Sequence, residues 1–168
     1  PDYAGAVSIF INAVTKLNKY KNDIRIFGNT NLKNTFTKKY INIPLKKKYF
    51  KSLTKIYLNN FLKIENKRKS NIIEIHNRPK YLESLKHLKN RKFVLYFHND
   101  PLSIAGSEKI NERISLVDTC DKIIFNSNWT KDQFTSNLDK FYKNSTKLIV
   151  IHQSASKKKV DIYKKKRI

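Results

Sequence analysis

The feature that most constrains this sequence is a series of four short apolar runs, separated by longer segments with helical periodicity. We predict the runs to be strands, at residues 71–75, 92–97, 122–125 and 147–151. Strands that alternate with helices at this spacing indicate right-handed βαβ units and a parallel sheet. The predicted fold class is therefore α/β, a parallel sheet flanked by helices.

The remaining elements follow from apolar spacing and from capping signals. Helices are predicted at residues 5–20, 49–67, 79–88, 107–119 and 127–138, with short strands at 23–27 and near 40–43. Trp129, Phe134, Leu138 and Phe141 are interpreted as core residues. Arg113, beside Glu112 in the middle of a predicted helix, is interpreted as part of an exposed charged face.

The chain has 168 residues and a net charge of +23. This positive charge does not by itself identify a partner. Lysine supplies most of the charge and is spread through every segment, as an AT-rich coding sequence would produce. Basic clusters at 46–48, 157–159 and 164–167 would still attract an anionic membrane surface or nucleic acid. Cys120 is the only cysteine, so no intrachain disulfide can form, and a reducing cytosol is expected.

Polar side chains follow each of the four main predicted strands. Ligands of open parallel sheets bind outside the carboxyl ends of the strands, so these side chains share the edge where a site is expected. A helix cap would explain Ser, Thr, Asp or Asn there, but neither His nor Arg is a favoured cap. The residues are His76, Asn77 and Arg78; His98, Asn99 and Asp100; Asn126, Ser127 and Asn128; and His152 and Gln153.

Several roles remain open for these residues. His98 fits a hydrogen-bonding group for a polar ligand or a structural histidine, and no Cys/His spacing supports a metal site. Asp100 precedes Pro101, so a turn or cap role competes with ligand contact. Arg78 offers a planar fork for carboxylate or phosphate, or forms a surface ion pair. Gly5, at the start of a helix, would let an anionic group approach the backbone.

The order of the motifs resembles the N-terminal half of the family 4 glycosyltransferases. They are Pro-x-x-Ala-Gly-Ala before a long helix, then EIHNRP, HNDP, DKIIFNSNWTKDQF and LIVIHQ. The resemblance implies one Rossmann-like domain of a GT-B fold, in which two such domains face each other across a cleft. Enzymes of this family transfer a sugar from a nucleotide-sugar donor to an acceptor, retain the anomeric configuration and need no metal or other cofactor. Their N-terminal domain mainly holds the acceptor.

The resemblance also assigns roles to individual residues. It places His98 and Asp100 at the catalytic centre, with His98 orienting the sugar by hydrogen bonding. It implies substrate-binding roles for Gly5, His76, Arg78, Asn99 and Ser127. Ala4 stands where the family usually has the first glycine of a Gly-Gly loop, so the match at Gly5 is partial.

The resemblance predicts that the chain is a fragment. The family's first strand would precede Pro1, and its donor-binding domain would begin near Ile168. Residues 1–152 are then an incomplete Rossmann-like domain, and 153–168 a basic linker. The absence of methionine fits this expectation, and we expect the isolated chain to transfer no sugar.

The predicted function is sugar transfer to a saccharide or lipid-linked acceptor in cell-envelope polysaccharide synthesis. The expected location is the cytoplasm, with peripheral attachment at the inner membrane face. The rival is a basic nucleic-acid-binding α/β module, which requires exposed aromatic residues for base stacking. Most aromatic residues here fit core positions, so nucleic acid is not the expected partner.

Overall fold

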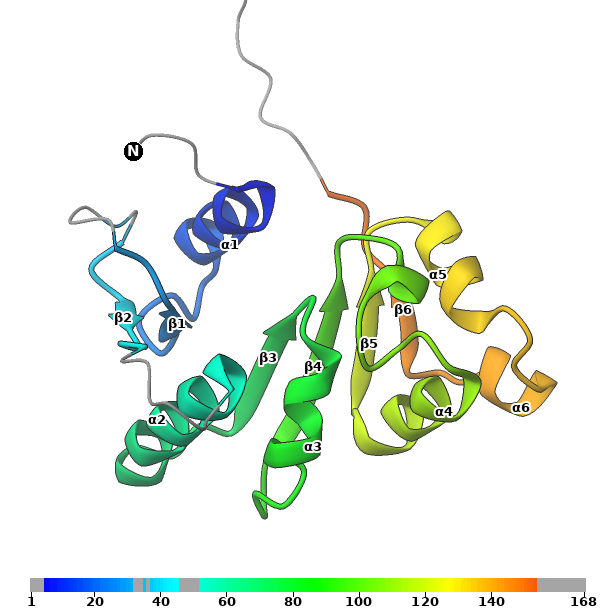
Figure 1. Cartoon of the computed structure of the whole chain (residues 1–168). Helices are drawn as coiled ribbons and strands as arrows, with labels where there is room; N and C mark the ends of the chain where they lie inside the picture. The colour runs from blue at the N-terminus through cyan, green and yellow to red at the C-terminus, as the bar shows by residue number, and fades with distance from the viewer. Residues whose placement is uncertain (1–4, 32–34, 36, 46–51, 154–168) are drawn as a thin grey trace, which may run out of the picture.

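The computed structural model describes residues 5–31, 35, 37–45 and 52–153 of the chain. Its centre is a four-stranded, all-parallel sheet in the order β3-β4-β5-β6 (Figure 1). The strands are β3 (Ile72–His76), β4 (Lys92–Phe97), β5 (Lys122–Phe125) and β6 (Leu148–Val150). Helices flank this sheet, so the predicted α/β class with a Rossmann-like parallel sheet is confirmed.

A smaller parallel sheet precedes it in the chain. Strands β1 (Ile26–Gly28) and β2 (Tyr40–Asn42) pair with each other, and α2 (Leu53–Lys67) follows them. The described strands thus form two separate sheets. A first strand preceding Pro1 stays a prediction.

One face of the four-stranded sheet carries the main core. Buried side chains from alternate strand positions, such as Ile75, Leu95 and Ile123, pack with Leu85 and Leu116 from the helices. The helices on this side are η1 (Pro79–Tyr81) with α3 (Leu82–Leu85), and α4 (Ile110–Thr119) (Figure 1). Beyond them in the chain come α5 (Asn128–Thr135) and α6 (Lys140–Lys143).

The opposite face is covered less completely by the described residues. Burial along β3 alternates, with Ile72 and Glu74 exposed and Ile73 and Ile75 buried. Strands of parallel sheets that are apolar almost throughout are usually buried on both faces. Instead, α1 (Ala6–Leu17) lies near the carboxyl ends of β3 and β4, where Phe10 contacts side chains of this face.

Most predicted elements are confirmed, with differences at their ends. Strands 92–97 and 122–125 have the predicted bounds, and Ser127 caps α5 by accepting a hydrogen bond from the Thr130 backbone amide. The predicted helix 79–88 is a 3-10 turn followed by one short helix. The last backbone hydrogen bonds to this helix come from the amides of Lys86 and Leu88, which bond the carbonyls of Leu82 and Leu85. The short η2 (Pro101–Ser103) and α6 were not predicted. The start of the predicted helix 49–67 and nearly all of the linker 153–168 lie outside the described residues.

Two interpretations of individual side chains are wrong. Phe134 and Leu138 are core residues, but Trp129 is 57% exposed and Phe141 is 80% exposed, because short helices separated by turns place them outward. Arg113 is only 2% exposed rather than on a charged face. Its guanidinium donates to the backbone carbonyls of residues 107, 108 and 136, so it ties together loops whose carbonyls lack helix partners.

Within the described ranges, no helix is both long and apolar enough to cross a membrane.

Candidate functional site

The sheet brings two of the predicted site histidines into direct contact. His76 ends β3 and His98 follows β4, and the two strands are paired in parallel register. His76 Nδ1 lies 2.8 Å from His98 Nε2, and the ring centroids are 5.1 Å apart. The sequence argument that placed these side chains on one edge is therefore correct for this pair.

The contact is part of a longer hydrogen-bonded chain. Glu74 Oε1 lies 2.9 Å from His76 Nε2, on the other side of that ring. Gln153 Nε2 lies 2.5 Å from His98 Nδ1. The order is Glu74, His76, His98 and Gln153; we call these four residues the histidine chain. It runs from an exposed carboxylate to an exposed amide through two partly buried rings.

The backbone of His98 is held from both sides by side-chain amides. Asn77 Oδ1 accepts from the His98 amide at 2.8 Å, and Asn126 Nδ2 donates to the His98 carbonyl at 2.8 Å. Asn77 has a φ of 50°, a left-handed conformation that Asn tolerates better than most residues. Thr130 Oγ1 donates to Asn126 Oδ1 at 2.6 Å. Neighbouring strand ends thus fix the position of His98.

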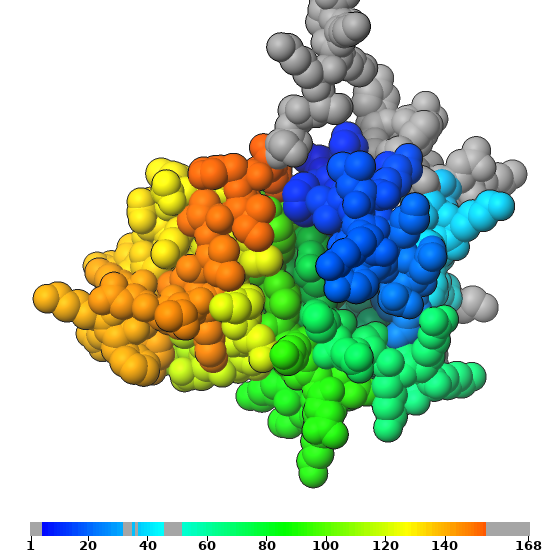
Figure 2. All heavy atoms as spheres, turned by 180° about the vertical axis from the view of Figure 1, so that it is seen from behind, coloured from blue at the N-terminus to red at the C-terminus, as the bar shows by residue number. Residues whose placement is uncertain are grey.

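Aromatic side chains form the walls around these groups. The Tyr96 ring stacks on His98 at 4.3 Å with an interplanar angle of 11°, and Phe10 approaches His98 edge-on at 5.0 Å. Tyr96 donates its hydroxyl to the Ile151 carbonyl at 3.1 Å. Seen from behind, the surface is hollowed between α1, in blue, and the end of the described chain, in orange, with the green strands between them (Figure 2). The arrangement combines apolar ring faces with groups that can hydrogen-bond a polar ligand.

Burial keeps His98 uncharged near neutral pH. Burial and the adjacent His76 lower the pKa of His98 to about 4, against the smaller opposing effect of Glu74. A neutral imidazole has one N–H donor and one nitrogen acceptor, so His98 can take part in only one donating hydrogen bond.

The other residues predicted to form the site lie at the same edge but outside the histidine chain. Asp100 Oδ1 accepts from the Leu102 amide at 3.0 Å and caps η2, which is the turn role that the sequence allowed. Asn99 Oδ1 accepts from Asn77 Nδ2 at 3.1 Å. Ser127 serves as the α5 cap. A catalytic or substrate role for each stays a prediction.

Arg78 and Gly5 remain available to a ligand. Arg78 is exposed, bonds only the Asn77 carbonyl and has no ion-pair partner among the described residues, so the surface ion pair considered for it is not formed there. Gly5 has an ordinary φ of −62°, and a Cβ built on it would meet no atom within 4 Å. The described structure does not itself require glycine at this position.

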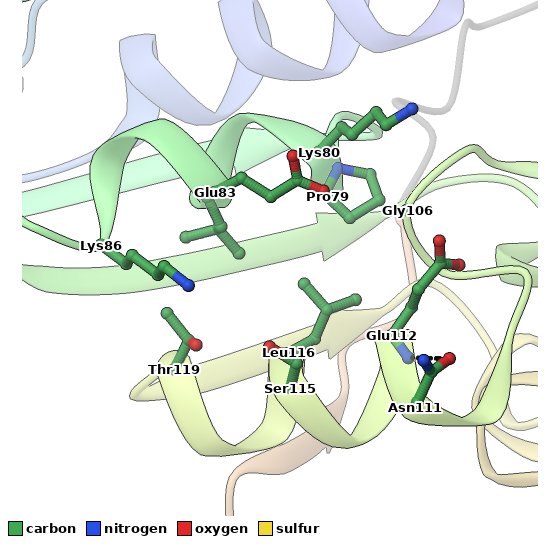
Figure 3. A pocket seen from close by; sticks show the side chains of 11 residues that line it. Pro79, Lys80, Glu83, Lys86, Gly106, Asn111, Glu112, Ser115, Leu116 and Thr119 are labelled. Atoms are coloured by element: carbon green, nitrogen blue, oxygen red, sulfur yellow. Dashed lines mark hydrogen bonds between the residues drawn. The ribbon is translucent and has the colours of Figure 1, made fainter.

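Other chemistry-bearing features lie away from the histidine chain. A surface pocket between η1–α3 and α4 is lined by Pro79, Lys80, Glu83, Glu112, Ser115 and Thr119, among others, with balanced charges (Figure 3). None of the predicted site residues lines it. Burial raises the pKa of Cys120 to about 12, which makes this thiol a poor nucleophile. The described residues contain no group of three or more potential metal ligands from His, Cys, Asp and Glu.

Sequence reasoning missed two members of the site, Glu74 and Phe10. It placed Asn77, Asn126 and Gln153 at the correct edge of the sheet but gave them no individual role. One signal was present: Glu74 is the only charged residue in its strand and lies two positions before His76, on the same face. The contact from Phe10, near the start of the described chain, carries no comparable signal in the sequence.

Compared with known proteins, the chain matches no protein-family model and no curated sequence.

Proposed function

We propose that this chain is the acceptor-side domain of a retaining glycosyltransferase that resembles family 4. It would hold a saccharide or lipid-linked acceptor beside His98, in cell-envelope polysaccharide synthesis. The observation that carries the proposal is the placement of His98 at the carboxyl edge of a parallel sheet, with its backbone bonded by Asn77 and Asn126. Ligand sites of parallel sheets lie at this edge.

The surroundings of His98 suit a sugar. Phe10 is partly exposed and offers ring surface for the apolar face of a pyranose, while His98, backed by the buried Tyr96 ring, offers a hydrogen-bonding atom to its hydroxyls. In this proposal, the nucleotide-sugar donor binds a second domain and no metal is needed. The role of the present chain is to hold the acceptor hydroxyl against the anomeric carbon of the sugar, which lowers the entropic part of the barrier.

A second candidate function is nucleic-acid binding, and one observation favours it. Trp129 and Phe141 are exposed on α5 and α6, with Lys131, Lys140 and Lys143 close in sequence. Exposed aromatic rings beside lysines are the features that stack and attract single-stranded nucleic acid. We rank this candidate second because it gives no role to the histidine chain or to the side chains that hold His98.

NMR titration of the labelled 168-residue chain separates the two functions. The probes are octyl glucoside, octyl mannoside and octyl galactoside below their micelle concentrations, and a mixed-sequence single-stranded RNA. We expect a glycoside to shift the amide signals of Phe10, Asn77 and Gln153, and His98→Asn to abolish this shift while Trp129→Ala preserves it. RNA-induced shifts at Trp129 and Phe141 without any glycoside response would overturn the proposal in favour of the second candidate.

We further propose that the protein works in the cytoplasm and attaches through α1 to an anionic inner membrane surface. Ile9 and Tyr20 are more than half exposed and Leu17 is 88% exposed. Lys16 and Lys19 are exposed close by, and residues 5–22 contain no acidic side chain. An apolar face flanked by lysines is typical of helices that lie in the membrane interface, and each lysine adds about 1 kcal/mol near anionic lipid.

Vesicle sedimentation tests this attachment. We expect binding to vesicles of phosphatidylcholine with phosphatidylserine, and much weaker binding to phosphatidylcholine alone. Leu17→Glu should reduce binding strongly. Phe141→Glu alters a similarly exposed apolar residue on α6, 80% against 88% for Leu17, and should not reduce binding. An equal loss in both variants would contradict a specific role for α1.

A further inference from the structure

The histidine chain permits one arrangement of protons that satisfies every contact as it stands. The Glu74 carboxylate only accepts, so His76 must carry its proton on Nε2. If His76 is neutral, its Nδ1 is then an acceptor, and His98 must donate from Nε2 across the 2.8 Å contact. His98 Nδ1 is left as an acceptor, and Gln153 Nε2 donates to it.

The alternative arrangement conflicts with the position of Gln153. A cationic His76 would donate from Nδ1, and His98, with one proton, would then have to carry it on Nδ1. Two donors, His98 Nδ1–H and Gln153 Nε2–H, would face each other at 2.5 Å. With the Gln153 amide in its observed orientation, the geometry therefore favours the neutral arrangement, in which each group donates toward Glu74; the cationic arrangement requires a half-turn of this amide, which brings Oε1 to His98 Nδ1.

We propose that Glu74 and His76 are positioning residues that fix the Nε2–H tautomer of His98, so that its Nδ1 accepts a hydrogen bond from a ligand hydroxyl in the place that Gln153 occupies. The inference rests on the proposed function for the class of ligand, an alcohol of a saccharide. It adds two residues that act through His98 and one that occupies the ligand's position.

The location of Gln153 supports this assignment. Gln153 follows the end of β6 and has an exposed side chain. It is the only member of the histidine chain that comes from outside the segments of β3 and β4. A ligand hydroxyl could take over its hydrogen bond without unpairing any strand. Because burial keeps His98 neutral, its acceptor nitrogen is available at neutral pH.

Nitrogen-15 NMR of the histidine rings in the 168-residue chain tests the tautomer directly. At pH 7 we expect His98 to be protonated only on Nε2, with a coupling across the hydrogen bond to His76 Nδ1. Exposed His87 provides the ordinary tautomer mixture in the same spectrum. Glu74→Ala releases His76, so we expect a population of His98 with the proton on Nδ1. Glu74→Gln can still accept from His76 and should restore the wild-type spectrum.

The control for removal of a carboxylate is Glu83→Ala, on the exposed side of α3. A proton on His98 Nδ1 in the wild type, or an unchanged His98 tautomer in Glu74→Ala, would overturn the inference. Neither result depends on whether a glycoside binds, so the tautomer and the proposed function fail independently.

Ligand affinity tests the place of Gln153. Removing its competing amide by Gln153→Ala should tighten binding of whichever octyl glycoside shifts the His98 region, by about threefold to tenfold, the range expected for one hydrogen bond. Glu74→Ala should weaken it by a similar factor, and Glu74→Gln should not. Weaker glycoside binding in Gln153→Ala would show that Gln153 assists the ligand and would overturn this part of the inference.

Discussion

Polar clusters lie at both ends of the sheet, and they differ in whether solvent or a ligand can reach them. At the amino end, fully buried Glu65 accepts hydrogen bonds from Arg25, Ser70 and Arg91, residues that shortly precede β1, β3 and β4. At the carboxyl end, the histidine chain runs out to an exposed amide. We call the first group the Glu65 cluster. A closed ionic cluster holds elements together, whereas an open chain offers an atom to a ligand.

The partners of Glu65 show what its cluster stabilises. Arg25 belongs to the segment before the two-stranded sheet and bonds Glu65 Oε2 at 3.0 Å; Arg91 belongs to the four-stranded sheet and bonds Oε1 at 3.3 Å. The Ser70 amide and hydroxyl complete the set at 2.5 and 2.9 Å. One carboxylate thus joins α2 to residues beside both sheets.

Removing the Glu65 carboxylate should have the largest effect. Glu65→Ala leaves two largely buried guanidinium groups without their counterion, so we expect a loss of about 3–5 kcal/mol in the free energy of unfolding. Urea unfolding followed by circular dichroism measures it, with Glu83→Ala as an exposed control that should change stability by less than about 0.5 kcal/mol. If Glu65→Ala does not fold, Glu65→Gln should fold with a lowered midpoint. Equal midpoints for the Glu65 variants and the control would remove the contrast between the two ends.

The pH dependence of stability should instead report on His98, at the carboxyl end of the sheet. The pKa of His98 is about 4 in the folded chain and near its ordinary value of 6.5 when unfolded. The unfolded state therefore binds the proton more tightly, so stability present above about pH 6.5 is lost as the pH falls toward 4. Allowing for solvent at the partly exposed ring, we expect a loss of about 1–2 kcal/mol that His98→Asn removes. Parallel stability curves for wild type and His98→Asn between pH 4 and 6.5 would refute this.

Two asparagines with left-handed backbones give the finest comparison of the two ends. Asn77 (φ 50°) precedes the site residue Arg78 and bonds His98 and Asn99; Asn90 (φ 59°) precedes Arg91, and its side chain bonds nothing among the described residues. Glycine tolerates this conformation. We expect Asn77→Gly to cost about 1–2 kcal/mol and Asn90→Gly to stay within about 0.5 kcal/mol of wild type, measured by thermal unfolding. A similar cost for both would mean that the Asn77 amide contributes nothing.

Sequence patterns were sufficient for the fold because they recur within each βα unit. The runs at 92–97 and 122–125 are bounded by polar residues and match strands at their full length. The edge on which His76 and His98 meet follows from the direction of parallel strands alone. These inferences need only local periodicity and one topological rule.

The Glu65 cluster and the burial of individual side chains could not be predicted, because they depend on contacts between segments that are distant in sequence. Glu65 looks like any glutamate on an amphipathic helix until Arg25 and Arg91 are placed beside it. Trp129 and Arg113 were misjudged for the same reason, since apolar or charged character does not show which way a short helix faces. Burial of a polar side chain is decided by partners that the local sequence does not contain.

The histidine chain has a consequence for how the protein is made. Each strand of the four-stranded sheet pairs with the one before it in the chain, so the sheet can grow strand by strand as the chain leaves the ribosome. Asn126 bonds the His98 carbonyl only after β5 has joined, whereas Phe10 is synthesised before any strand of this sheet. A partly synthesised chain could therefore contain β3 and β4 with His98 and still lack one of the two amides that hold its backbone, so ligand binding would report that β5 has joined the sheet.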